Sequence, residues 1–204
     1  MKTYLCAALM ALGLIACSAE STSNKTPATQ NAAVNVKLHG SAIEESLGDD
    51  LRLIDSNGNP ASLQDFQGKV VAVSFGYTHC PDVCPTNLLD LAKTMKLLGE
   101  NAAKVQVLFV SVDPSRDTPT VLKEYVPLFD ERFIGLTAPD DAAMAPILKA
   151  WKVAATKVPV SDGHYTVDHS AGLYLVNPQG KAAVYLPYGS KAEAIAQDIQ
   201  ALLR

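Results

Sequence analysis

The sequence predicts an α/β fold in which a mixed β-sheet is flanked by helices on both faces. In the middle of the chain, short β-branched runs alternate with segments of helical periodicity, which is typical of parallel strands joined by helices. Near each end of the predicted domain, two short apolar runs flank a turn sequence, which indicates an antiparallel hairpin. Alternation combined with hairpins favours a mixed sheet over a purely parallel one.

The first hairpin is expected within residues 51–63, because Asn57-Gly58 is typical of a tight turn. Bounded β-branched runs then predict buried strands at residues 70–75, 105–112 and 133–136. Apolar residues at helical spacing predict helices at residues 85–99, 119–129, 140–151 and 190–202. Asp140 and Ser190 are the expected N-terminal caps of the last two helices.

The second hairpin is expected to pair residues 171–176 with residues 182–186 around the turn sequence Asn-Pro-Gln-Gly. It comes directly before the last helix. The complete order of elements is therefore that of a thioredoxin-like fold, with an added N-terminal β-hairpin and a second hairpin before the last helix.

The first 17 residues have the composition of a secretory signal. Lys2 is followed by an apolar stretch over residues 5–16, which is too short to span a membrane. The sequence Leu-Ile-Ala-Cys that ends at Cys17 resembles a bacterial lipobox, which predicts that Cys17 becomes the lipid-modified N-terminus. The alternative is an ordinary signal peptide that is cleaved nearby, with Cys17 incidental.

Residues 18–37 are expected to form a flexible tether, because they hold almost no large apolar side chains that could offset the entropy of ordering. Residues 38–204 then form one domain. The net charge of −4 gives no basic footprint for nucleic acid. We therefore expect an exported bacterial domain that a lipid anchors to a membrane facing the periplasm, while the sequence leaves open which membrane this is.

Cys80 and Cys84 are the thiols expected in the folded domain, since Cys6 leaves with the signal and Cys17 carries lipid. They follow a predicted buried strand and sit where a helix is expected to begin. Their spacing predicts that both sulfurs share one helical face, and the helix N-terminus predicts lowered thiol pKa values. Such a pair fits a disulfide switch, a peroxide-reducing nucleophile, or two ligands of a soft metal ion.

Three motifs make the sequence similar to a known family. GYTHCPDVCPTNL at residues 76–88, SVDPSRDTP at residues 111–119 and VDHSAGLYLVNPQG at residues 167–180 together resemble the Sco/SenC family of copper chaperones. The resemblance runs over nearly the whole domain. It implies a thioredoxin-like fold and a role in assembling the binuclear copper centre of cytochrome c oxidase.

The resemblance implies that Cys80, Cys84 and His169 bind one copper ion per chain, monovalent or divalent. The implied partners are the copper-bearing subunit of the oxidase and another copper donor protein. From the residues alone, His169 is expected to open the strand at 171–176, at a place that faces the cysteine helix in thioredoxin-like proteins. Two sulfurs and one imidazole suit copper.

Further residues are candidates for tuning or orienting the site. Asp168 is a candidate partner for the His169 ring, and His79 is a candidate for tuning the thiolates. Asp113, with Arg116 and Asp117, is expected to fix a loop close to the metal. No role is assigned to His39 at the edge of the tether or to His164, which lies in a predicted mobile loop.

The sequence favours a metallochaperone over a turnover enzyme, and it leaves a thiol–disulfide reductase open as the main alternative. A general reductase is disfavoured by the three-residue spacer and by a histidine where thioredoxins carry a proline. A peroxidase is less favoured, because Pro81 stands where the peroxidase motif has a threonine. A structural zinc site is the weakest alternative, since no fourth ligand is apparent.

Overall fold

The computed structural model describes residues 37–44, 46–48 and 50–204. The expected signal peptide with Cys17, and the tether up to residue 36, lie outside the described residues. Within the described part of the chain, no helix is both long and apolar enough to cross a membrane.

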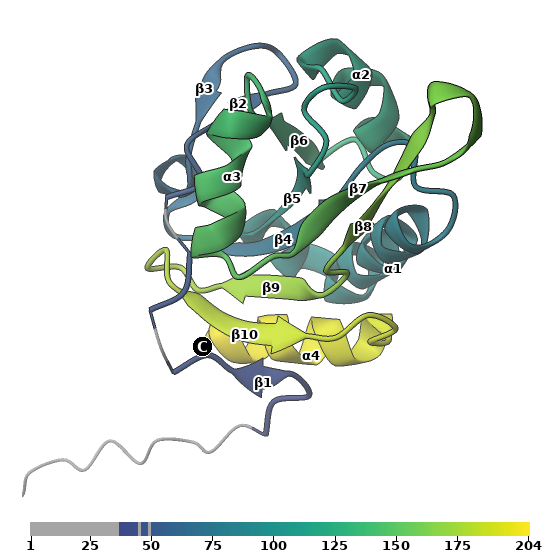
Figure 1. Cartoon of the computed structure of the whole chain (residues 1–204). Coiled ribbons are helices and arrows are strands. Elements are labelled where there is room, and N and C mark those ends of the chain that lie inside the picture. Colours follow the sequence, from purple (N-terminus) through teal and green to yellow (C-terminus); the bar gives the residue numbers. More distant parts are fainter. Residues whose placement is uncertain (1–36, 45, 49) are drawn as a thin grey trace, which may run out of the picture. The chain divides into compact units, whose positions relative to one another are not determined.

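A mixed sheet organises the domain, as the sequence predicts (Figure 1). It has eight strands, of which the short β1 was not predicted. Its order is β1-β10-β9-β4-β5-β6-β2-β3. The central strands β4, β5 and β6 are parallel, and the remaining neighbours are antiparallel. The strands are β1 (Ser41–Ala42), β2 (Leu53–Asp55), β3 (Pro60–Ala61), β4 (Val70–Gly76), β5 (Val105–Ser111), β6 (Ile134–Thr137), β9 (Leu173–Val176) and β10 (Ala182–Leu186).

Helices lie on both faces of this sheet, as predicted. The helices are α1 (Val83–Leu98), α2 (Pro119–Tyr125), α3 (Asp141–Ala150) and α4 (Ala192–Leu202). Helices α1 and α4 pack against each other behind the sheet in Figure 1, whereas α3 lies in front of it. All seven residues of β4 and of β5 are buried, because these two strands are covered on both sides.

The ends of two helices differ from the prediction. The last helix has Lys191, not Ser190, at its N-cap; the Ser190 hydroxyl donates to the Pro187 carbonyl at 2.7 Å and so closes the preceding turn instead. The helix expected at residues 119–129 stops at Tyr125 and continues as a 3₁₀ turn over Val126–Leu128. Pro127 lacks the amide hydrogen that a regular α-helix needs there.

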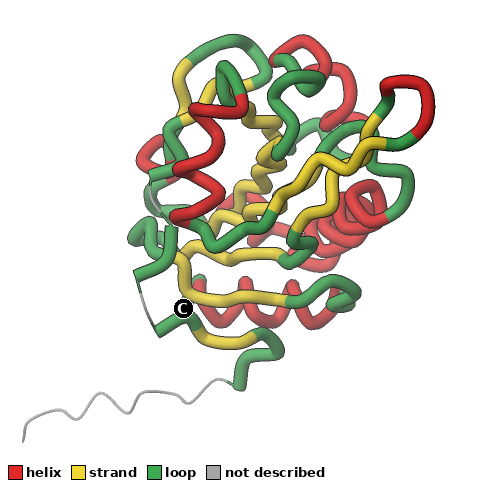
Figure 2. The backbone as a smooth tube through the Cα atoms, in the orientation of Figure 1, coloured by secondary structure: helices red, strands yellow, loops and turns green. Residues whose placement is uncertain are grey.

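A second, two-stranded sheet is absent from the sequence prediction. Strands β7 (Ala155–Pro159) and β8 (Tyr165–His169) pair antiparallel and form a separate hairpin, which crosses in front of β4 and α1 in Figure 1. In Figure 2 its two strands are yellow and the turn at its tip is red. Most of its residues are exposed or half-buried, and Val167 alone of its ten strand residues is buried. Without a buried apolar run, the sequence gives little signal for these strands.

Candidate metal centre

The two cysteines meet where the segment after β4 leads into α1. We call residues 77–82 the cysteine loop. Cys84 is the second residue of α1, whereas Cys80 lies before the helix begins. The expectation that both sulfurs share a helical face is therefore wrong; the turn of the loop brings them together. The backbone N–H of Cys84 donates to Cys80 Sγ at 3.5 Å, while the Asp82 side chain at the N-cap makes no capping bond.

Burial controls the acidity of Cys84. Its side chain is only 2% exposed. Burial raises the pKa of the Cys84 thiol far above its ordinary value, and the backbone hydrogen bond at Tyr77, which acts in the opposite direction, does not offset this. The expected lowering of both thiol pKa values is therefore wrong for Cys84, since burial removes the water that would stabilise a thiolate.

The Cys84 sulfur packs close to the backbone at the end of β4, where a glycine leaves room for it. Gly76 ends β4, and a Cβ atom at this position would lie 2.8 Å from Cys84 Sγ and 2.7 Å from Cε2 of Phe109. Real Cβ atoms do not approach other atoms this closely. Glycine at the end of the strand is thus what allows the sulfur to sit against the sheet.

His169 comes to the two sulfurs from the β7–β8 hairpin. It is the last residue of β8 and pairs with Ala155, so the expectation that it opens the next strand is wrong. Its Nε2 nonetheless lies 3.3 Å from Cys84 Sγ. The ligand atoms of Cys80, Cys84 and His169 all lie within 4.8 Å of one another.

The backbone fixes the orientation of this imidazole. Nδ1 of His169 lies 2.9 Å from the carbonyl oxygen of Ser170. Because a carbonyl only accepts hydrogen bonds, Nδ1 carries the hydrogen and the lone pair of Nε2 faces the sulfurs. The Tyr77 ring meets the imidazole edge-on, with centroids 5.7 Å apart.

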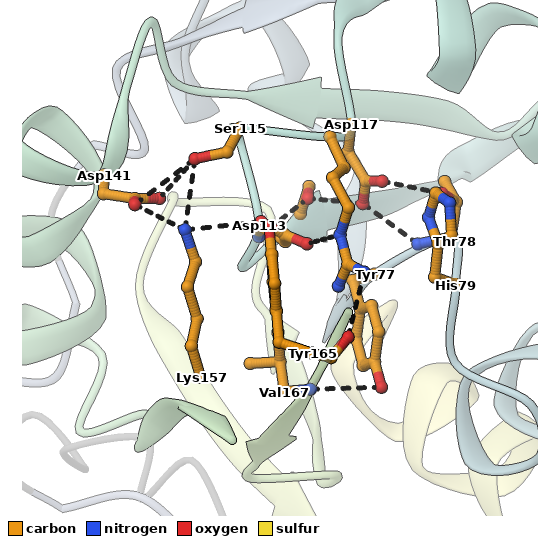
Figure 3. A network of polar contacts seen from close by, with 12 residues as sticks. Tyr77, Thr78, His79, Asp113, Ser115, Asp117, Asp141, Lys157, Tyr165 and Val167 are labelled. Atoms are coloured by element: carbon orange, nitrogen blue, oxygen red, sulfur yellow. Dashed lines mark hydrogen bonds and ion pairs between the residues drawn. The ribbon is translucent and has the colours of Figure 1, made fainter. Parts of the chain in front are cut away.

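Two of the candidate tuning residues do not touch the ligand atoms. Asp168 is exposed, and the Ser170 carbonyl takes the orienting role that was expected of it. His79 is also exposed and turns its Nδ1 to the hydroxyl of Thr78 at 3.1 Å (Figure 3). The Thr78 hydroxyl donates its hydrogen to Asp117, so His79 is the donor in its contact with Thr78.

The loop after β5 lies close to the site, as expected. We call residues 112–118 the bracing loop. Asp117 is fully buried and accepts hydrogen bonds from the Thr78 amide at 3.0 Å and from the Thr78 hydroxyl at 2.6 Å. Asp113 is also fully buried and pairs with Arg116. These carboxylates do not reach the three ligand atoms; they hold the segments around them.

The remaining histidines are remote from the ligand group. His164 lies at the turn of the β7–β8 hairpin, where its amide donates to Ser161 and its carbonyl accepts from Val160. Two backbone hydrogen bonds thus close this turn, and the predicted mobility of the loop stays a prediction. His39 lies beside α4, with Nε2 2.6 Å from Oε1 of Gln197.

The described residues thus define a thioredoxin-like domain with a soft-metal site at the carboxyl end of its central strand. Two thiols and one imidazole nitrogen suit a soft or borderline ion, and three ligands leave one side open. The chain belongs to the SCO1/SenC family, because the model of that family matches residues 40–204.

Individual relatives are similar over most of the domain. An SCO2-like protein of Rickettsia felis is 36% identical over 137 residues, which are 66% of this chain and 66% of that protein. A structure of Bradyrhizobium japonicum ScoI with copper bound is 39% identical, with a TM-score of 0.71 over 78% of this chain and 100% of that one. Yeast Sco1 with copper bound is 32% identical, with a TM-score of 0.70 over 77% of this chain and 88% of that one.

Proposed function

We propose that this protein is a copper-binding chaperone that delivers copper for the binuclear centre of cytochrome c oxidase. The observation that carries the proposal is the convergence of Cys80, Cys84 and His169, whose ligand atoms lie within 4.8 Å of one another. Two thiolates and one imidazole favour monovalent copper, and divalent copper is compatible with a further ligand from solvent. Membership of the SCO1/SenC family and the copper-bound relatives support the same ion.

Transfer proceeds by ligand exchange in this proposal. The three side chains hold the ion and leave one side open. Thiolates of the acceptor attack that side, and the ion leaves the chaperone's ligands one after another without entering water. Membership of the SCO1/SenC family supports the copper-bearing subunit of the oxidase as the acceptor, and another copper protein as the donor.

We further propose that Cys17 carries lipid and that residues 18–37 tether the domain at residues 38–204 to a membrane facing the periplasm. This is supported by the apolar stretch at residues 5–16 and by the lipobox-like sequence before Cys17. A tether of this length reaches roughly 20–25 Å as a random coil. The domain would then work close to a membrane-bound acceptor.

A thiol–disulfide reductase is the second candidate. Both cysteines are free, and their sulfurs are close enough for a disulfide to form with a modest change of the loop. Oxidation of Cys80 and Cys84 would join the two sulfurs and remove two metal ligands, so copper uptake requires the reduced protein. Both candidate functions use the same two thiols. Copper binding also uses His169, so a His169 variant distinguishes the two functions.

Anaerobic titration of the reduced domain with monovalent copper tests the proposal. The wild type should take up one ion per chain, and Cys80→Ser and Cys84→Ser should each abolish uptake. His169→Ala should weaken copper binding but keep thiol–disulfide exchange. The matched control is His164→Ala, which removes an exposed histidine from the same hairpin and should bind like the wild type. Full uptake by either serine variant would refute the ligand set.

A further inference from the structure

The position of His169 depends on how the β7–β8 hairpin is seated. The hairpin pairs with no strand of the eight-stranded sheet. Its placement therefore rests on side-chain contacts and on the short connections at its base. Where these contacts lie decides what holds the third ligand near the two sulfurs.

A buried carboxylate anchors the hairpin. Asp113 Oδ1 accepts a hydrogen bond from the Tyr165 hydroxyl at 2.9 Å (Figure 3). Asp113 also pairs with Arg116. Arg116 Nη1 donates to the backbone carbonyl of Tyr165 at 3.0 Å, and its guanidinium lies 3.8 Å from the centroid of the Tyr165 ring. The first residue of β8 is thus held by its ring, its hydroxyl and its backbone.

Three further contacts extend the anchor along the hairpin. Lys157 on β7 donates to Ser115 at 3.1 Å and pairs with Asp141 at 2.5 Å. On β8, the amide of Val167 donates to the Tyr77 hydroxyl at 3.3 Å. Val167 is two residues before His169, so the anchored part of β8 reaches almost to the ligand.

The bracing loop holds the cysteine side as well. Asp117 accepts from the amide and the hydroxyl of Thr78, two residues before Cys80, and from the Ser111 hydroxyl at 2.6 Å. The Ser111 oxygen in turn accepts from the amide of Asp113 at 3.0 Å. One short loop is therefore bonded to both segments that supply metal ligands.

We propose that the bracing loop sets the distance between the sulfurs and the imidazole. Asp113 and Arg116 are positioning residues for His169 through Tyr165, and Asp117 is a positioning residue for Cys80 through Thr78. Groups that orient metal ligands from behind typically change metal affinity about 10- to 100-fold when removed. The inference rests on the proposed function only where copper is the readout.

A double-mutant cycle tests the imidazole half. Tyr165→Phe removes the hydroxyl and keeps the ring over Arg116. Affinity for monovalent copper, measured by competition with a chelator, should fall about 10-fold in the wild-type background. The affinity should not fall further in the His169→Ala background, because the anchored hairpin then carries no ligand to position. An equal fall in both backgrounds, or no fall in either, would overturn the proposal.

For the cysteine side of the site, the wild-type and His169→Ala backgrounds should respond alike. Asp117→Asn should weaken copper binding in both backgrounds, since it acts on Cys80. The control is Asp130→Asn, which breaks a partly buried aspartate–arginine pair with Arg132 and should leave affinity unchanged. A general loss of stability would affect all three variants in the same way, whereas the proposed roles separate them.

Hydrogen exchange of the metal-free protein tests the anchoring of the β7–β8 hairpin without copper. In Tyr165→Phe, backbone amides of β7 and β8 should exchange faster, while those of β4 and β5 should be unchanged. Unchanged exchange in the hairpin would overturn the proposal even if copper binds. If the wild type binds no copper but the hairpin amides of Tyr165→Phe exchange faster, the proposed function is wrong and the anchoring of the hairpin is supported.

Discussion

Gly76→Ala is the perturbation that most sharply links packing to the metal site. The new Cβ would lie 2.8 Å from Cys84 Sγ and 2.7 Å from Phe109 Cε2. Comfortable contacts lie at about 3.5–4.0 Å, so sulfur and ring must each retreat by roughly 1 Å. Cys84 is 2% exposed and Phe109 is 0% exposed, so neither has open space behind it. Overpacking of this kind costs about 1–3 kcal/mol of folding free energy.

The same strain should appear in metal affinity. If the sulfur relieves the strain by moving away, copper must pull it back, and the affinity falls by up to that energy. This corresponds to about 5- to 150-fold, since 1.4 kcal/mol is tenfold. Urea unfolding gives the loss of stability, and competition with a chelator for monovalent copper gives the loss of affinity.

Gly135→Ala is the matched control for this prediction. On β6, its Cβ would lie 2.8 Å from Leu122 Cβ and 3.1 Å from Val126 Cγ2, which is similar crowding against residues that are not metal ligands. It should lose similar stability and keep wild-type affinity. If Gly76→Ala is destabilised but binds copper as tightly as the wild type, the reasoning about the sulfur is refuted.

Three more predictions follow from buried polar groups. Because burial raises the pKa of Cys84 above its unfolded value of about 9, its contribution to stability is fully present below that pH and is lost above it, at a rate that approaches about 1.4 kcal/mol per pH unit; between pH 8.5 and 10, the metal-free wild type should lose stability more steeply than Cys84→Ala. The same raised pKa predicts that copper displaces at least one proton, so that affinity rises at least about tenfold per pH unit near neutrality; calorimetry in buffers of different ionisation enthalpy would show no proton release if this is wrong. Asp198 is buried and accepts from the amides of His39 and Gly40, both at 2.8 Å; Asp198→Ala should cost about 1–3 kcal/mol and expose the chain near β1 to proteases, and unchanged cleavage would contradict the contact's role.

Much of the fold is readable in the sequence because its central strands are continuous apolar runs. Strands β4 and β5 were predicted within one residue, since both are buried on two faces and bounded by turn residues. The β7–β8 hairpin was missed because nine of its ten strand residues are exposed or half-buried, so no apolar run marks its strands. The sequence alone therefore placed His169 on the wrong strand.

The site, like the fold, was predicted only in part from the sequence. Its three candidate ligands were named from motifs, and the structure brings exactly these ligand atoms together. The roles of Ser170, Tyr165 and Tyr77 depend on where the hairpin packs, which is a tertiary property without a local signal. The raised pKa of Cys84 likewise depends on burial that a helix-end argument does not include.

X-ray absorption spectroscopy of the copper-loaded protein identifies the ligand atoms themselves. We expect two sulfur ligands and one imidazole nitrogen per copper ion, and loss of the imidazole scattering in His169→Ala with both sulfurs retained. A wild-type spectrum with sulfur ligands only, or one that His169→Ala leaves unchanged, would contradict the claim that this histidine completes the site.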